Sequence, residues 1–103
     1  MMFTDLQKSL EILGLSDRVT MKQIKSRHRE LVKRYHPDTG NDAEGEKIKL
    51  INAAFRVLSD YLESYRFSFS EDEFYSQNPE ERIRRQFMDD ALWGSGREQR
   101  SKQ

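Results

Sequence analysis

Pro37 separates two stretches of the chain that have strong helical periodicity, residues 20–35 and residues 43–60. A proline disfavours the helical conformation of the residue before it, so the first helix is expected to end near Tyr35. Two long amphipathic helices joined by a short loop pack side by side in antiparallel directions. The sequence therefore predicts an all-α fold whose centre is a two-helix hairpin.

The apolar residues of both stretches recur at the i, i+3 and i+4 spacing of a helix with one buried face. Thr20 and Gln23 have the spacing of a capping box, which satisfies free backbone groups at a helix start. The stripe expected to face the core consists of Met21, Ile24, His28, Leu31 and Tyr35 in the first stretch and of Ile48, Ile51, Phe55, Leu58 and Leu62 in the second.

A shorter helix is expected before the hairpin, over residues 4–13, with Thr4 and Gln7 as its capping box and Gly14 as its stop. This short N-terminal helix can pack across the hairpin through an apolar stripe made of Phe3, Leu6, Leu10 and Leu13.

Two weaker signals follow the hairpin. A helical turn is expected over residues 61–67. Farther on, Asn78 as a cap and Pro79 at the first helical position predict a helix over residues 79–92. The fold is thus expected to include a helical C-terminal extension.

Charge is distributed unevenly along the chain, although the formal net charge is zero. Residues 16–35 hold seven basic and two acidic residues, a net charge of +5. Residues 68–92 hold seven acidic and three basic residues, a net charge of −4. A basic helix face attracts an anionic protein, nucleic acid or membrane surface, but a charge run alone is also typical of a helix face that meets only solvent.

The chain has 103 residues and no cysteine. It is long enough for one small domain with a short appendage, and it offers no thiol nucleophile and no cysteine ligand for zinc. No apolar run approaches the ~20 residues of a membrane-spanning helix. The N-terminus also lacks the features of a signal peptide, so we expect a cytoplasmic protein that does not associate with membranes.

Besides a protein-docking surface, the sequence could hold a metal site, a hydrolase active site or a nucleic-acid interface. A metal site would need more ligands than His28 and His36 offer, and His28 lies on the apolar stripe, where packing is the commoner role. His36 and Asp38 could act as base and orienting carboxylate, but no serine stands in a nucleophile turn. A helix-turn-helix variant would have an unusually long turn, and its basic helix would contact mainly phosphates. A small basic helical nucleic-acid-binding protein is kept as the second interpretation.

The motif His-Pro-Asp at residues 36–38 gains weight from its surroundings. Together, "LEILGL" at 10–15, "IKSRHRELVKRYHPD" at 24–38 and "INAAFRVLSD" at 51–60 resemble the J-domain of DnaJ-type co-chaperones in order and spacing. The resemblance covers about residues 5–67. It implies docking on a seventy-kilodalton heat-shock chaperone of the DnaK type and stimulation of ATP hydrolysis by that partner. It implies no enzymatic chemistry and no cofactor in the chain itself.

The resemblance also assigns roles to residues. The loop that contacts the partner maps to His36, Pro37 and Asp38, and the aspartate is expected to engage an arginine of the partner. The basic second helix of the family, which docks on an acidic surface, maps to Lys22, Lys25, Arg29, Lys33 and Arg34.

Several residues depart from the usual family pattern. Arg27 and His28 replace an Ala-Tyr pair, and Thr39 and Gly40 replace a basic residue and an asparagine. We expect Arg27 to widen the basic face, and His28 could make docking mildly dependent on pH.

The expected organisation is a J-domain over residues 1–67, an acidic and aromatic extension over 68–93, and a flexible tail over 94–103. The modules that follow the J-domain in full-length DnaJ do not appear, so a small stand-alone J-domain protein is expected. The extension could bind a client or targeting partner, or lay its acids over the basic helix. The favoured expectation is that it folds back and buries Phe74, Ile83, Phe87 and Trp93.

Overall fold

The computed structural model describes residues 1–36 and 42–93. These residues form five helices and no strand, which confirms the all-α prediction. The chain divides into two units, Met1–Tyr65 and a second unit that begins at Arg66, and each is considered by itself.

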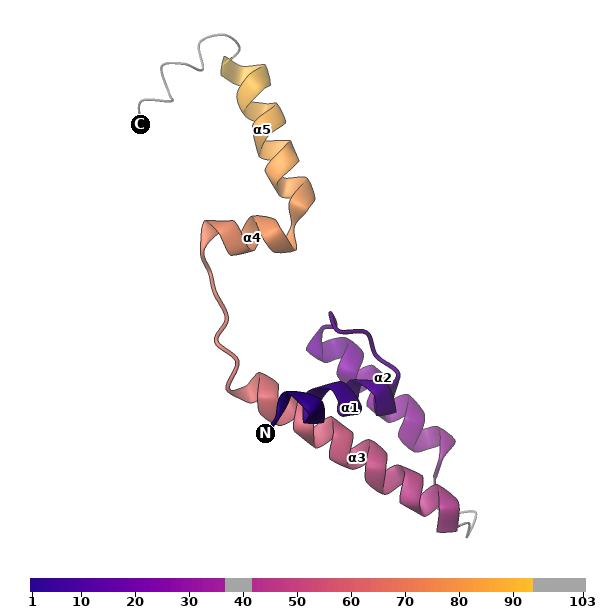
Figure 1. Ribbon diagram of the computed structural model, residues 1–103. Coiled ribbons are helices and arrows are strands. Elements are labelled where there is room, and N and C mark those ends of the chain that lie inside the picture. Colours follow the sequence, from indigo (N-terminus) through magenta and orange to yellow (C-terminus); the bar gives the residue numbers. More distant parts are fainter. Residues whose placement is uncertain (37–41, 94–103) are drawn as a thin grey trace. The chain divides into compact units, whose positions relative to one another are not determined.

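The first unit contains α1 (Phe3–Leu13), α2 (Met21–Arg34) and α3 (Asp42–Glu63). Helices α2 and α3 lie side by side and run antiparallel, and α1 lies across them (Figure 1). The hairpin and the N-terminal helix packed on it therefore match the predicted arrangement.

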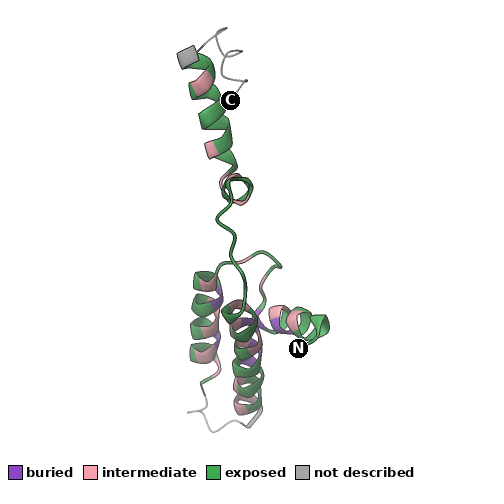
Figure 2. Cartoon of the chain, turned by 90° about the vertical axis from the view of Figure 1, so that its left-hand side faces the viewer, coloured by how far each residue is buried: buried purple, intermediate pink, exposed green. Residues whose placement is uncertain are grey.

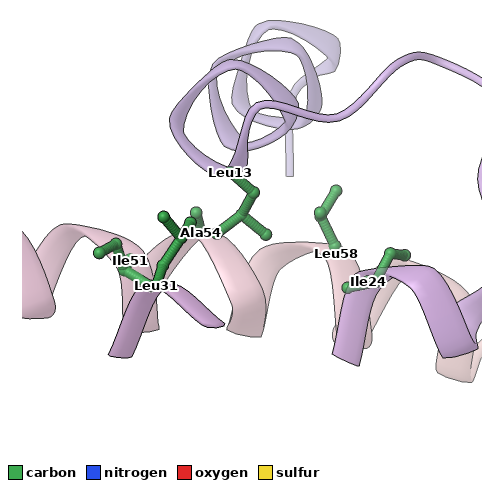
Figure 3. Close-up of a cluster of buried hydrophobic side chains, with 6 residues drawn as sticks. All are labelled: Leu13, Ile24, Leu31, Ile51, Ala54 and Leu58. Carbon is green, nitrogen blue, oxygen red and sulfur yellow. The ribbon is translucent and has the colours of Figure 1, made fainter. Parts of the chain in front are cut away.

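The core is small and draws on all three helices. Its buried side chains come one from α1, two from α2 and three from α3, and they converge where α1 meets the hairpin (Figure 3). They are Leu13, Ile24, Leu31, Ile51, Ala54 and Leu58. Figure 2 shows that buried residues are confined to the facing sides of these helices. Leu13 is the only one of the six with no exposed surface, and Leu6 and Leu10 of α1 also pack against this cluster.

The start of α1 differs from the prediction. The backbone N–H of Met2 donates to Asp5 Oδ2 at 2.8 Å, so the helix begins at Phe3 and the expected Thr4–Gln7 capping box does not form. An acidic side chain in the first turn also faces the positive end of the helix dipole, which favours Asp5 in this role. Phe3 remains 70% exposed and does not extend the apolar stripe.

The other ends of α1 and α2 follow the sequence closely. Gly14 stops α1 in the left-handed conformation, with φ of 68°, and its N–H donates to the carbonyl of Glu11. Thr20 and Gln23 form the predicted capping box, with Thr20 Oγ1 accepting from the Gln23 N–H at 3.1 Å. Helix α2 ends at Arg34, close to the end near Tyr35 that Pro37 predicts.

Helix α3 is longer than predicted. It continues to Glu63, and residues 64–70 are not helical, so the separate turn expected over 61–67 is wrong. The apolar spacing continues through Leu62, which packs against the core and carries the helix one turn farther.

The second unit contains α4 (Glu71–Gln77) and α5 (Pro79–Trp93). Helix α4 was not predicted. Ser70 caps it by accepting from the Glu73 N–H at 3.2 Å, and the three acidic residues of its first turn favour its start. Asn78, expected to cap α5, instead donates its side-chain amide to the carbonyl of Phe74 and closes α4.

Candidate partner-binding surface

Four cations of α2 share its outward face. At ~100° per residue, they fall within a sector of about 80° that points away from the core. All four are exposed, and no described residue forms an ion pair with any of them. We call this set the outward basic face; it consists of Lys22, Lys25, Arg29 and Lys33. Its charge is therefore available to an anionic partner.

Arg27 and Arg34 occupy a different side of α2, at least ~100° around the helix from the outward basic face. Both are paired with Glu30, at 3.0 Å for Arg27 and 3.5 Å for Arg34. The structure thus places Arg34 apart from the four cations with which the sequence grouped it.

Arg27 also has a structural partner. Its Nε donates to the backbone carbonyl of Leu13 at 2.8 Å, at the end of α1. The expectation that Arg27 widens the basic face is wrong, because its guanidinium is directed to α1 and Glu30. A pairing between residues fourteen positions apart leaves no sign in the local sequence pattern.

His36 is the second residue after the end of α2 and is exposed. Pro37 and Asp38, as well as Thr39 and Gly40, lie outside the described residues. The two sides of this segment are linked by Tyr35 and Lys47, since the Lys47 ammonium lies 4.7 Å from the centre of the Tyr35 ring. Tyr35 is half-buried against the core, so the residue before His36 is held in place.

His28 connects α2 to α3. Its Nε2 lies 2.8 Å from Asn52 Oδ1, and its ring stacks on Phe55 with 4.1 Å between centroids and 16° between planes. This confirms the packing role expected for a histidine on the apolar stripe. His28 is therefore oriented toward α3 and not toward the outward basic face.

The second unit has its own polar cluster. Arg85 donates to Tyr75 Oη at 3.1 Å and to Glu71 Oε2 at 2.7 Å, which ties α5 to α4. The hydrogen bond that Arg85 donates to Tyr75, followed by the charge of the Glu71 carboxylate, raises the pKa of Arg85. Within this unit, Ile83 and Phe87 of α5 remain largely exposed, at 68% and 71%.

Other kinds of site find little support in the described part of the chain. Residues 1–36 and 42–93 contain no group of three or more His, Asp or Glu side chains arranged to hold a metal ion. Over the same residues, no helix has the length and apolar character needed to span a membrane.

The first unit is thus a three-helix domain whose middle helix presents cations and leads into the His-Pro-Asp sequence. The family model for the DnaJ domain matches residues 9–65, and the chain belongs to this family.

Named relatives agree with the family match. The chain is 42% identical over 74 residues to the chaperone protein DnaJ of Rickettsia prowazekii, covering 69% of this chain and 20% of the relative. It is 50% identical over 52 residues to the chaperone protein DnaJ of Caldicellulosiruptor saccharolyticus, covering 48% and 13%. It is 48% identical over 50 residues to human DnaJ homolog subfamily A member 4, covering 48% and 12%. The matched region spans a fifth or less of each relative. No solved structure matches the chain.

Proposed function

We propose that this chain is a co-chaperone that docks on a seventy-kilodalton heat-shock chaperone of the DnaK type and stimulates its ATP hydrolysis. The observation that carries the proposal is the outward basic face, four exposed cations on the helix that leads into His36. In the proposal, this face docks on acidic residues of the partner, and His36, Pro37 and Asp38 contact it beside the docked helix.

The proposed action is allosteric. The chain supplies contacts and no chemistry, because hydrolysis takes place in the partner. A protein that binds one state of an enzyme more tightly than another shifts the enzyme toward the favoured state. Tight binding of the hydrolysis-competent state, with Asp38 paired to an arginine of the partner, would therefore be enough to raise the hydrolysis rate.

The experiment is the ATPase rate of a DnaK-type chaperone measured with increasing amounts of this chain. Asp38→Asn is expected to abolish stimulation, because it removes the charge that would pair with the arginine. Lys25→Glu is expected to raise the concentration needed for half-maximal stimulation about tenfold, since it reverses a charge in the outward basic face.

Lys8→Glu is the matched control. Lys8 is exposed on α1, outside the outward basic face, and the same change there is expected to leave the titration unaltered. Absence of stimulation by the unaltered chain, or full stimulation by Asp38→Asn, would reject the proposal. An equal effect of the two lysine changes would reject the assignment of docking to the outward basic face.

The second unit is the proposed contact for a client or targeting partner. Ile83 and Phe87 are one helical turn apart on α5, and α4 does not cover them. An exposed apolar face of this kind is typical of a helix that binds another protein.

A further inference from the structure

A second surface of the first unit has the features of a binding groove. A hollow of about 370 Å³ lies between the end of α1, the end of α2 and the first half of α3. Its lining combines apolar side chains with three cations and one acid, and the outward basic face contributes no residue to it. We call it the α1–α3 groove.

The apolar part of the groove is accessible. Ile12 of α1 is 38% exposed and Leu50 of α3 is 56% exposed, and both line the hollow together with Tyr35. A single exposed leucine is ordinary, but exposed apolar side chains from different helices around one hollow indicate a place where another apolar group can be seated.

The charged part of the groove is mostly positive. Arg27, Arg34 and Lys47 line it, and Glu11 is the one acid in the lining. Glu30 pairs with both arginines but is not part of the lining. Because exposed ion pairs contribute little stability, a carboxylate of a bound partner can replace or share these contacts at low cost.

The groove and the outward basic face lie on different sides of α2. The groove opens on the side of α2 that carries Arg27 and Arg34. Around the axis of α2, this side is at least ~100° from Lys25 and Arg29. Substitutions on the outward basic face and in the groove can therefore test the two surfaces separately.

We infer that the α1–α3 groove binds a short acidic segment of a partner protein, with an apolar side chain on Ile12 and Leu50 and carboxylates against Arg34 and Lys47. The three cations of the lining favour an acidic segment, and the exposed apolar side chains of Ile12 and Leu50 favour a peptide over a simple anion. The inference does not rest on the proposed co-chaperone function, because the groove lies apart from the outward basic face and shares only Arg34 with the residues that the family resemblance assigns to the chaperone contact.

The test uses the full chain, labelled with ¹⁵N, and a synthetic peptide that contains Glu-Asp-Glu-Leu-Phe between glycine and serine residues. The amide signals of Ile12, Leu50 and their neighbours are expected to shift with saturation, with a dissociation constant on the order of 100 μM for so open a site. Peptides with Gln-Asn-Gln-Leu-Phe or Glu-Asp-Glu-Gly-Ser are expected to bind at least about tenfold more weakly, because each removes one of the two required features.

Variants then locate the site. Lys47→Glu and Leu50→Ser change exposed positions, and each is expected to weaken binding about tenfold. Glu30→Gln is expected to strengthen binding several-fold, because it frees two arginines from a competing carboxylate. Lys25→Glu is the control on the outward basic face and is expected to change binding less than about twofold.

Several results would overturn the inference. These are no saturable shifts at millimolar peptide, shifts centred on Lys22 and Lys25, equal shifts with inorganic phosphate, or weaker binding by Glu30→Gln. Shifts of the groove amides with protein concentration alone would assign the groove to a second copy of the chain and would also overturn it. If the unaltered chain binds the peptide but does not stimulate the chaperone ATPase, the co-chaperone proposal is rejected and the groove proposal is not.

Discussion

Replacing Arg27 by alanine is expected to destabilise the first unit by about 1–2 kcal/mol. A hydrogen bond from a charged donor contributes roughly 1.5–3 kcal/mol, and Arg27 makes one to the Leu13 carbonyl at 2.8 Å. The Arg27 side chain is 33% exposed, which reduces this contribution through solvent screening. Loss of the exposed pair with Glu30 adds only ~0.3–0.5 kcal/mol, and the better helix propensity of alanine offsets part of it.

The assay is urea unfolding followed by far-ultraviolet circular dichroism, with thermal unfolding as a second measurement. A loss of 1 kcal/mol lowers Tm by roughly 4–8 °C in a domain of this size. Arg29→Ala is the matched control, because it removes the same residue type from the same helix at an exposed position without a described partner, and it should change stability by no more than ~0.5 kcal/mol.

The two variants are also expected to differ in function. Arg29→Ala should weaken stimulation of the chaperone, whereas Arg27→Ala should retain it at temperatures where the domain is folded. Equal losses of stability in the two variants would refute the argument that Arg27 is a structural tie between α1 and α2. So would a variant Arg27→Ala that is as stable as the unaltered chain.

Three further outcomes follow from the same structure, each measured by urea unfolding. Gly14→Ala is expected to cost about 1–2 kcal/mol, because φ of 68° disfavours a side chain and an added Cβ would lie 3.0 Å from the neighbouring guanidinium. Leu13→Ala is expected to cost about 3–5 kcal/mol, a large part of the total stability of so small a domain, because the side chain is wholly buried. Lys25→Gln should be neutral or stabilising by a few tenths of a kcal/mol, since it removes repulsion within the outward basic face, while weakening stimulation. A cost above ~1 kcal/mol for Lys25→Gln would show that the lysine has a structural role instead.

The helices of the first unit could be predicted because their signals are local and agree with one another. Thr20 and Gln23 are three residues apart and cap α2 without help from the rest of the chain. The apolar spacing that marks Ile51 and Leu58 is the same spacing that buries them. Two local signals compete at the start of α1, where Thr4 and Asp5 each fit a capping role, and the prediction there was wrong.

Helix α4 was missed for a related reason. Its seven residues are too few to show an apolar period, and residues that favour strands or turns, such as Phe74 and Tyr75, interrupt it. The available signal was Ser70 followed by three acids, which is a helix start without a hydrophobic run behind it. Helix α4 has no buried residue, and it is stabilised instead by its cap, by the helix dipole and by the hydrogen bonds from Arg85 of α5.

The candidate site was predicted in composition but not in arrangement. A net charge of +5 over residues 16–35 identifies α2 as basic, yet a sum along the sequence assigns every charge the same weight. The structure separates these charges by their partners. Glu30 pairs with Arg27 and Arg34 on one side of α2, and a carbonyl from another helix holds Arg27. Such long-range partners are a property of the fold, so a linear pattern cannot contain them.

The four cations of the outward basic face make no comparable contact that would stabilise the fold. Lys22 and Lys25 are three residues apart, and Lys25, Arg29 and Lys33 follow at intervals of four, so each repels its neighbours by ~0.2–0.5 kcal/mol. No described residue offsets this repulsion with an ion pair. A glutamate at one of these positions would stabilise the helix better, because it would form ion pairs of the kind that Glu30 forms with Arg27 and Arg34. Residues that destabilise the fold without any compensating contact are expected at binding sites, where the partner supplies the contact. On this argument the outward basic face, and not the total charge of the helix, is the surface to associate with a partner.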